Sequence, residues 1–218
     1  MSSTVPHRFL FRYSFPVRYI ERLPRKGRKL LNLPEACLLP DLGELDGVVP
    51  FGELRLAWNA RGLGVSVRVH RKRHPPAGRL KEPTAADGLQ LWIDTRNTQS
   101  IHRAGRFCHH FCILPRCSDS KSDKSVALQL PIARARDDAP LADSKQMETS
   151  VELLADGYRL EVWLPADVLN GYDPQASPRI GFYYLLRDSE LGDQFLSVGH
   201  EFPFAHDPSL WCTLELVV

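Results

Sequence analysis

The stretch Asp87-Gly-Leu-Gln-Leu-Trp-Ile-Asp-Thr-Arg96 decides the fold class, because its apolar and polar side chains alternate. In an extended strand, successive side chains point to opposite faces of the sheet. The two predicted faces hold Leu89, Leu91 and Ile93 on one side, and Gln90, Trp92 and Asp94 on the other. The first face is apolar and is expected to be buried. The second face is either a ligand platform or a surface that a loop covers.

The same two-residue period recurs along the chain and predicts an all-β protein. It is found in residues 9–15, 54–58, 65–69, 107–113, 158–164 and 210–216, whereas residues 179–187 are apolar on both faces, as expected of a strand buried on both sides. The 17 prolines argue against long helices, so the only helix predicted is a short one at Pro165–Leu169. We therefore predict a two-sheet antiparallel β-sandwich, jelly-roll-like, with long irregular loops and little helix.

The 218 residues suit a single large β-domain, and the 43% hydrophobic content is enough for a full core. We expect residues 1–49 to form an opening strand and an extended arm, and residues 50–218 to form the sandwich. Irregular structure is predicted for 22–50, 70–86 and 118–147, because these stretches lack the strand period. The polar start of the last stretch, Ser118–Ser125, is expected to be mobile.

Composition restricts the classes of partner. The net charge of +2 is too small to imply a nucleic-acid or membrane partner. The basic run Arg22–Lys29 lacks interleaved aromatics and is interpreted as a solvated arm rather than a phosphate site. The N-terminus lacks an uninterrupted apolar signal segment and the five cysteines are an odd number, so a cytoplasmic location is expected, or an extracellular one if a leader was removed. No pattern indicates an oligomeric state.

A series of motifs resembles a known family. Ala57-Trp-Asn59 and the stretch that starts at Asp87 are followed by Asp156-Gly-Tyr-Arg-Leu-Glu-Val-Trp-Leu-Pro165, Ile180-Gly-Phe182 and a closing Trp211 segment. This order is similar to that of the family 9 carbohydrate-binding modules and the related DOMON-like β-sandwiches, over about residues 50–218. The resemblance implies saccharide binding without cleavage, with structural calcium in some members. The Arg106-Phe-Cys-His-His-Phe-Cys112 segment departs from the family pattern.

The first candidate site is the polar face of the opening strand. Trp92 can stack on a pyranose ring, since the ring's axial C–H groups suit an aromatic face. Asp94 and Arg96 can form a bidentate pair that orients the carboxylate toward sugar hydroxyls. The alternative is a structural Asp94–Arg96 salt bridge, with Trp92 covered by the 118–147 stretch. Further candidate hydrogen-bonding residues are His102, Arg106, His109, Arg187 and Gln194.

A second candidate is a soft-metal site, with zinc as the typical ion. Cys108, His110 and Cys112 share one face of a strand. No Cys-x-x-Cys pair is present and the spacing matches no standard zinc module, so packing is the favoured interpretation. A third candidate is the acidic segment with Asp188 and Glu190, which can bind calcium or resemble glycosidase carboxylates. A solvated turn, with Gly192 at positive φ, is favoured there.

The sequence contains no G-x-S-x-G elbow, phosphate-binding loop or H-E-x-x-H motif. We therefore assign no catalytic residue and no required cofactor. The leading hypothesis is non-catalytic saccharide binding. The alternatives are a structural or protein-interaction module that has lost sugar binding, and a metal-binding protein or metal-dependent enzyme that uses the Cys/His strand.

Overall fold

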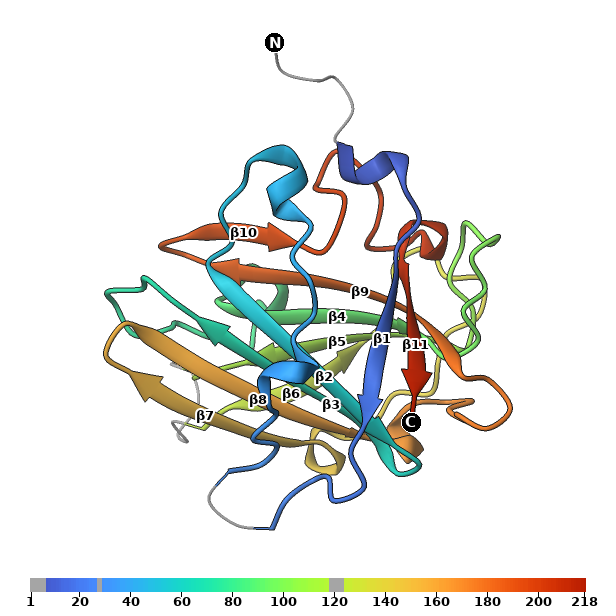
Figure 1. Ribbon diagram of the computed structural model, residues 1–218, viewed down its shortest axis with the longest axis horizontal. Coiled ribbons are helices and arrows are strands. Elements are labelled where there is room, and N and C mark those ends of the chain that lie inside the picture. Colours follow the sequence, from blue (N-terminus) through green and yellow to red (C-terminus); the bar gives the residue numbers. More distant parts are fainter. Residues whose placement is uncertain (1–6, 27–28, 118–123) are drawn as a thin grey trace.

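The computed structural model describes residues 7–26, 29–117 and 124–218, in which eleven strands form one continuous hydrogen-bonded sheet (Figure 1). The strands are β1 (Ser14–Tyr19), β2 (Gly52–Asn59), β3 (Gly62–Val69), β4 (Gly88–Asp94), β5 (Cys108–Leu114), β6 (Val126–Leu130), β7 (Glu148–Leu154), β8 (Gly157–Pro165), β9 (Arg179–Asp188), β10 (Gly192–Phe195) and β11 (Cys212–Val217). Short 3-10 helices lie between them: η1 (His7–Leu10), η2 (Glu35–Cys37), η3 (Gly43–Asp46), η4 (Pro83–Ala85), η5 (Ser144–Gln146), η6 (Ala166–Val168) and η7 (Pro208–Leu210).

The sheet folds back on itself into two layers, which confirms the predicted all-β sandwich. Its strand order is β6-β5-β4-β9-β11-β1-β2-β3-β8-β7, with β10 paired to β9. Strand β1 joins the layers because it pairs in parallel with both β11 and β2. The other strand pairs are antiparallel, so these two parallel pairings are the departure from the predicted arrangement. At the opposite edges, Ser125 and Thr149 hydrogen-bond at 2.9 Å and draw β6 toward β7.

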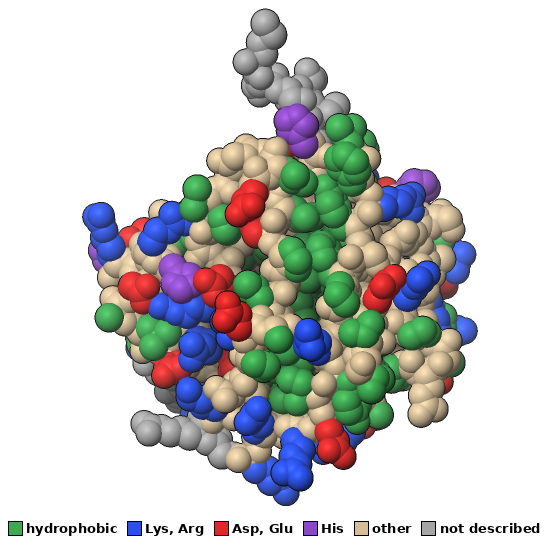
Figure 2. All heavy atoms as spheres, in the orientation of Figure 1, with side chains coloured by type: hydrophobic (Ala, Val, Ile, Leu, Met, Phe, Trp, Pro, Cys, Tyr) green, Lys and Arg blue, Asp and Glu red, His purple; other side chains and the backbone are tan. Residues whose placement is uncertain are grey.

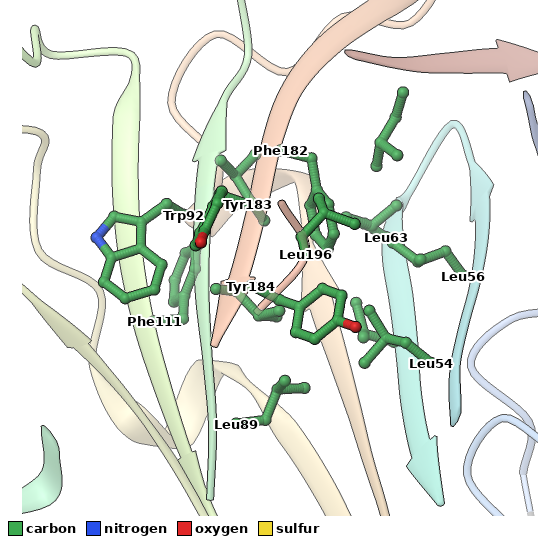
Figure 3. Packing of buried hydrophobic residues seen from close by; sticks show 14 of the residues in the cluster. Leu54, Leu56, Leu63, Leu89, Trp92, Phe111, Phe182, Tyr183, Tyr184 and Leu196 are labelled. Carbon is green, nitrogen blue, oxygen red and sulfur yellow. The ribbon is translucent and has the colours of Figure 1, made fainter. Parts of the chain in front are cut away.

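The core lies between the layers and is built from the apolar face of each strand. Leu54 and Leu56 of β2 face Phe182 and Tyr184 of β9 across this space (Figure 3). Leu89, Leu91 and Ile93 are each at most 1% exposed, as the alternation of β4 predicts. Strand β9 is buried on both faces from Ile180 to Leu186, as its apolar sequence also predicts. Burial of this apolar surface is the main driving force for the fold.

The described residues between Leu23 and Cys37 pack on the outer face of β2, β3 and β8. A second apolar cluster joins Leu23, Leu31 and Cys37 of this segment to Ala57 and Trp163. The Glu161 carboxylate fixes the segment by accepting hydrogen bonds from the backbone N–H groups of Leu31 and Asn32, both at 3.1 Å. The predicted packing role of the other tryptophans is confirmed, with Trp58, Trp163 and Trp211 all buried.

Three local predictions are corrected by the structure. Residues 7–10 form the turn η1 rather than a strand, because Arg8 donates to Asp46 of η3 at 2.6 Å and pairing begins only at Ser14. The short helix predicted at Pro165–Leu169 is present, but its predicted bounds are too wide, because η6 covers Ala166–Val168 and Pro165 is still part of β8. The 118–147 stretch contains β6 and η5, so it is not wholly irregular. The mobility predicted for its start falls mostly on residues 118–123, outside the described residues.

No helix among the described residues has the length and apolar character needed to cross a lipid bilayer.

Candidate functional site

Trp92 is buried and unavailable as a sugar platform. Its side chain lies on the side of β4 away from Leu54 and Leu56 (Figure 3), and the residue is only 2% exposed. One face of the indole stacks on His110, with ring centroids 4.4 Å apart. The edges of Tyr183 and Phe204 close around it at 5.9 and 5.4 Å. Among the described residues, an aromatic cover for Trp92 comes from Phe204, in the segment after β10.

The predicted Asp94–Arg96 ion pair is also replaced by other contacts. The Asp94 carboxylate accepts hydrogen bonds from the backbone N–H groups of Arg96 and Thr98, at 2.9 and 2.6 Å. The Arg96 guanidinium lies over the ring of Phe107, 4.8 Å from its centroid, and Arg106 contacts the same ring at 5.1 Å. Asp94 thus shapes the turn after β4, while both arginines are exposed beside Phe107.

The remaining predicted polar residues do not converge on one groove. Gln194 is buried, accepts the N–H groups of Phe51 and Gly52 at 2.9 Å each, and donates to the Tyr184 hydroxyl. His109 is 1% exposed inside the sandwich. Arg187 forms a bidentate ion pair with Asp193 at 2.7 and 2.9 Å. His102, in contrast, is exposed and lines a surface recess.

The Cys/His strand serves for packing. Among the residues that the structure describes, no three Cys, His, Asp or Glu side chains converge in a metal-binding arrangement. His110 stacks on Trp92 and its Nε2 donates to Gln90 Oε1 at 3.1 Å. Cys112 donates to the carbonyl of Pro83. Burial raises the pKa of Cys108 and of Cys112 to about 12, so both remain neutral thiols at physiological pH.

The two buried histidines predict acid sensitivity. Burial lowers the pKa of His109 and of His110 from 6.5 to about 4. The unfolded chain therefore binds more protons than the folded protein between these values, and stability falls as the pH drops from about 6.5 toward 4. Urea denaturation across this range should show a steadily lower midpoint. The dependence of this midpoint on pH should be weaker for His110→Gln than for the unaltered protein, whereas an equal dependence in the two proteins would contradict this assignment.

An ammonium group occupies the centre of the predicted cation site. The Lys72 Nζ lies 2.8 Å from Asp188, 3.2 Å from Asp87 and 3.9 Å from Glu190. The Lys72 side chain is 1% exposed. Burial alone lowers its pKa, but the hydrogen bonds and charges of Asp188 and Asp87 outweigh this and raise it above the usual value. Asp188 and Glu190 therefore neutralise Lys72, and Gly192 has the predicted positive φ of 92°.

A recess of about 440 Å³ opens on the surface beside β11, and we call it the aromatic recess. Its walls come from residues 8–13, the β4–β5 connection, the segment after β10, and η7 with the start of β11. Exposed rings lie on one wall, with Phe9 43% and Phe11 63% exposed. Figure 2 shows the corresponding apolar side chains gathered below the N-terminal end of the described chain. This volume falls within the usual range for small-molecule sites, about 300–1,000 Å³.

The rings of the aromatic recess are held in fixed positions. Phe9 stacks on Phe202 with centroids 4.4 Å apart, and the Arg8–Asp46 ion pair anchors the same turn. Tyr13 lies between Phe11 and Phe15, with centroids 6.2 Å from each. The buried Tyr13 hydroxyl, in a residue that lines the recess, has no hydrogen-bond partner among the described residues. A buried hydroxyl without a partner carries a desolvation cost.

Polar groups line the rest of the recess. The Asp207 carboxylate caps η7, accepting from the Ser209 N–H at 3.0 Å, and lies 3.1 Å from His102 Nδ1. Burial alone raises the pKa of Asp207, but hydrogen bonds from Ser209 and His102 outweigh it and lower the pKa. The Ser209 hydroxyl donates to Asp207, and the same His102 nitrogen faces both residues. A serine nucleophile needs one histidine nitrogen for itself and the other for the carboxylate, so this cluster is not a catalytic triad.

A larger and more open cleft, of about 1010 Å³, lies beside the arm. Among the described residues that line it, Trp163 is the one aromatic side chain, and it is 3% exposed. Its rim carries the exposed side chains of Arg25, Lys26 and Arg61. The aromatic recess is therefore the better candidate for binding a ligand that has both apolar and hydroxyl-bearing faces.

Comparison with solved structures gives a consistent fold. A family 9 carbohydrate-binding module from Caldicellulosiruptor kristjanssonii, in complex with cellotriose, superposes with a TM-score of 0.60 over 94% of this chain and 93% of the module. Its complex with glucose gives the same TM-score over 94% and 96%. This protein has the fold of those modules. Sequence identity is only 13% and 14%, so the likeness shows the fold alone.

A proposed carbohydrate-binding protein from Bacteroides uniformis also superposes, with a TM-score of 0.53, 14% identity, and coverage of 95% of this chain and 100% of that one. No protein-family model matches the sequence, and no curated protein matches it either. The resemblance to the family 9 modules expected from the order of motifs is thus confirmed at the level of structure.

Sequence reasoning missed most of the aromatic recess. His102 was the only one of its residues among the candidates, while Phe9, Phe11 and Tyr13 were assigned to a regular strand. The available signal was the alternation of Arg8 and Arg12 with these rings, because arginine is an unusual neighbour for a core strand. Gln99, Phe202 and Asp207 carried no local signal, since only the fold brings them beside residues 8–13.

Proposed function

We propose that this protein binds saccharides without cleaving them, and that the aromatic recess is the binding site. The observation that carries the proposal is a set of exposed rings beside hydrogen-bonding groups within one recess of suitable volume. A sugar ring presents C–H groups on one face and hydroxyls around its edge. The C–H groups suit stacking on the ring of Phe9 or Phe11. The hydroxyls suit hydrogen bonding with Gln99, His102 and Asp207.

The shared fold supports this proposal, because the family 9 module binds cellotriose and glucose on the same scaffold. The site proposed here differs from the one expected from the sequence, since Trp92 lies beneath Phe204. Isothermal titration with cellotriose and a glycan array test binding directly. Failure to bind any glycan would leave the alternative of a protein-interaction module, which the burial of Trp92 favours.

Phe11→Ala should weaken saccharide binding without loss of stability. The ring is 63% exposed, so its removal leaves no core cavity. Loss of one stacking contact costs about 1 kcal/mol or somewhat more, or about tenfold in affinity. Titration calorimetry on both proteins measures the change, and thermal unfolding should agree within about 0.5 kcal/mol.

Leu141→Ala is the matched control, because Leu141 is similarly exposed, at 61%, and does not line the aromatic recess. Its affinity for the glycan should equal that of the unaltered protein. Unchanged binding by Phe11→Ala, alongside measurable binding by the unaltered protein, would move the site elsewhere.

A further inference from the structure

Arg12 is an exposed cation on the wall of the aromatic recess. Within the part of the chain that the structure describes, no carboxylate forms an ion pair with its guanidinium, although many other arginines have one. The described contact of the group is a hydrogen bond from NH1 to Gln99 Oε1, at 3.0 Å. A guanidinium carries five N–H donors, so most of them remain available to a ligand.

A chain of hydrogen bonds holds this guanidinium in place. The amide of Gln99 that accepts from Arg12 also donates through Nε2 to the Thr213 hydroxyl at 2.5 Å. The Thr213 hydroxyl donates in turn to Asn97 Oδ1 at 3.2 Å. Thr213 belongs to β11, and its backbone N–H donates to the carbonyl of Tyr13, one residue after Arg12. The cation is therefore preorganised on the sheet, which lowers the entropy cost of binding a partner.

The other charged side chains of the recess have partners. Arg8 pairs with Asp46, and the Asp207 carboxylate accepts hydrogen bonds from Ser209 and faces His102. Among the described residues, no carboxylate lies within ion-pair distance of Arg12, so its guanidinium is open to an anionic group of a ligand. A carboxylate fits this group best, because its two oxygens match two parallel guanidinium N–H donors.

We propose that the saccharide bound in the aromatic recess carries a carboxylate, as a uronic acid residue does, and that Arg12 binds this group. This inference rests on the proposed saccharide-binding function. The rings contact the apolar face of the sugar while Arg12 selects for its charge. A sulfate ester shares the negative charge but not the planar two-oxygen geometry, so it serves as a separate arm of the test.

The test uses titration calorimetry on the full chain with four probes: trigalacturonate, its methyl ester, a sulfated disaccharide and cellotriose. The unaltered protein should bind trigalacturonate at least about tenfold more tightly than the methyl ester, as expected for a charge-assisted bidentate contact. Arg12→Gln should abolish this preference. Arg12→Lys should retain part of the preference for trigalacturonate, because lysine keeps the positive charge but lacks the two parallel N–H donors of a guanidinium.

Arg25→Gln is the control, since Arg25 is an exposed arginine that lines the larger cleft beside the arm and not the aromatic recess. It should keep the full preference, and thermal unfolding should confirm that each variant is folded. Equal affinity for acid and ester would overturn the carboxylate inference and leave saccharide binding intact. Arg12-dependent binding of the sulfated probe without trigalacturonate binding would also overturn it. No binding to these probes or to any glycan on an array would overturn the proposed function itself.

Discussion

Lys72→Met should lower the free energy of unfolding by about 3–5 kcal/mol, because it removes a buried cation that faces three carboxylates. The ammonium lies 2.8 Å from Asp188 and 3.2 Å from Asp87, both of which are 2% exposed. Methionine fills a similar volume but leaves these negative charges buried and uncompensated. Urea denaturation at neutral pH measures the loss, and the exposed Lys145→Met should match the unaltered protein.

The same contacts predict sensitivity to alkali. The pKa of Lys72 is raised above 10.5 in the folded protein, despite the opposing effect of burial. The stabilisation is therefore fully present below the unfolded value and disappears as the pH rises through the folded value. In Lys72→Met, the free energy of unfolding should not show this loss as the pH rises. A variant with wild-type stability at neutral pH would show that the cluster contributes nothing to folding.

Trp92→Ala should be similarly destabilising, by about 3–5 kcal/mol, because it deletes a buried indole and leaves a cavity. The ring is in contact with His110, Tyr183 and Phe204, so its loss affects both β5 and the segment after β10. Chemical denaturation gives the size of the effect. Trp92→Phe keeps an aromatic ring in the cluster and should lose less.

The two aromatic variants separate stability from binding. Trp92→Phe should bind saccharide as the unaltered protein does, since the indole is not part of the aromatic recess. Phe11→Ala should show the opposite behaviour, with full stability and weak binding. A saccharide affinity that depends on Trp92 and not on Phe11 would restore the strand β4 site.

The sequence predicts the sandwich well because its signal is local. Alternation places Leu89, Leu91 and Ile93 in the core, and an uninterrupted apolar run identifies β9 as buried on both faces, whichever strands they pair with. Alternation cannot predict whether Trp92 is exposed or buried. Its burial depends on Phe204, which lies far along the sequence and contacts the indole in the folded protein.

Similar limits apply to the charged candidates. Asp188 and Glu190 have the side chains of a cation site, but the cation comes from Lys72, which is remote in sequence. The alternation of Phe9, Phe11, Tyr13 and Phe15 predicts one strand, yet the contact of Arg8 with Asp46 turns the first residues away from the sheet. The aromatic recess forms at the point where this local pattern fails.

The parallel pairing of β11 with β1, where the two layers join, has a consequence for folding. Strand β11 inserts between β9 and β1, and Ser14 lies opposite Thr213. Nearly the whole described chain must therefore be looped before this pair can form, at a high cost in chain entropy. Until β11 is available, β9 and β1 have unpaired edges that can capture a strand from another chain. The pairing of β11 with β9 and β1 is expected to form slowly. A nascent chain is therefore most exposed to misassembly before β11 is available.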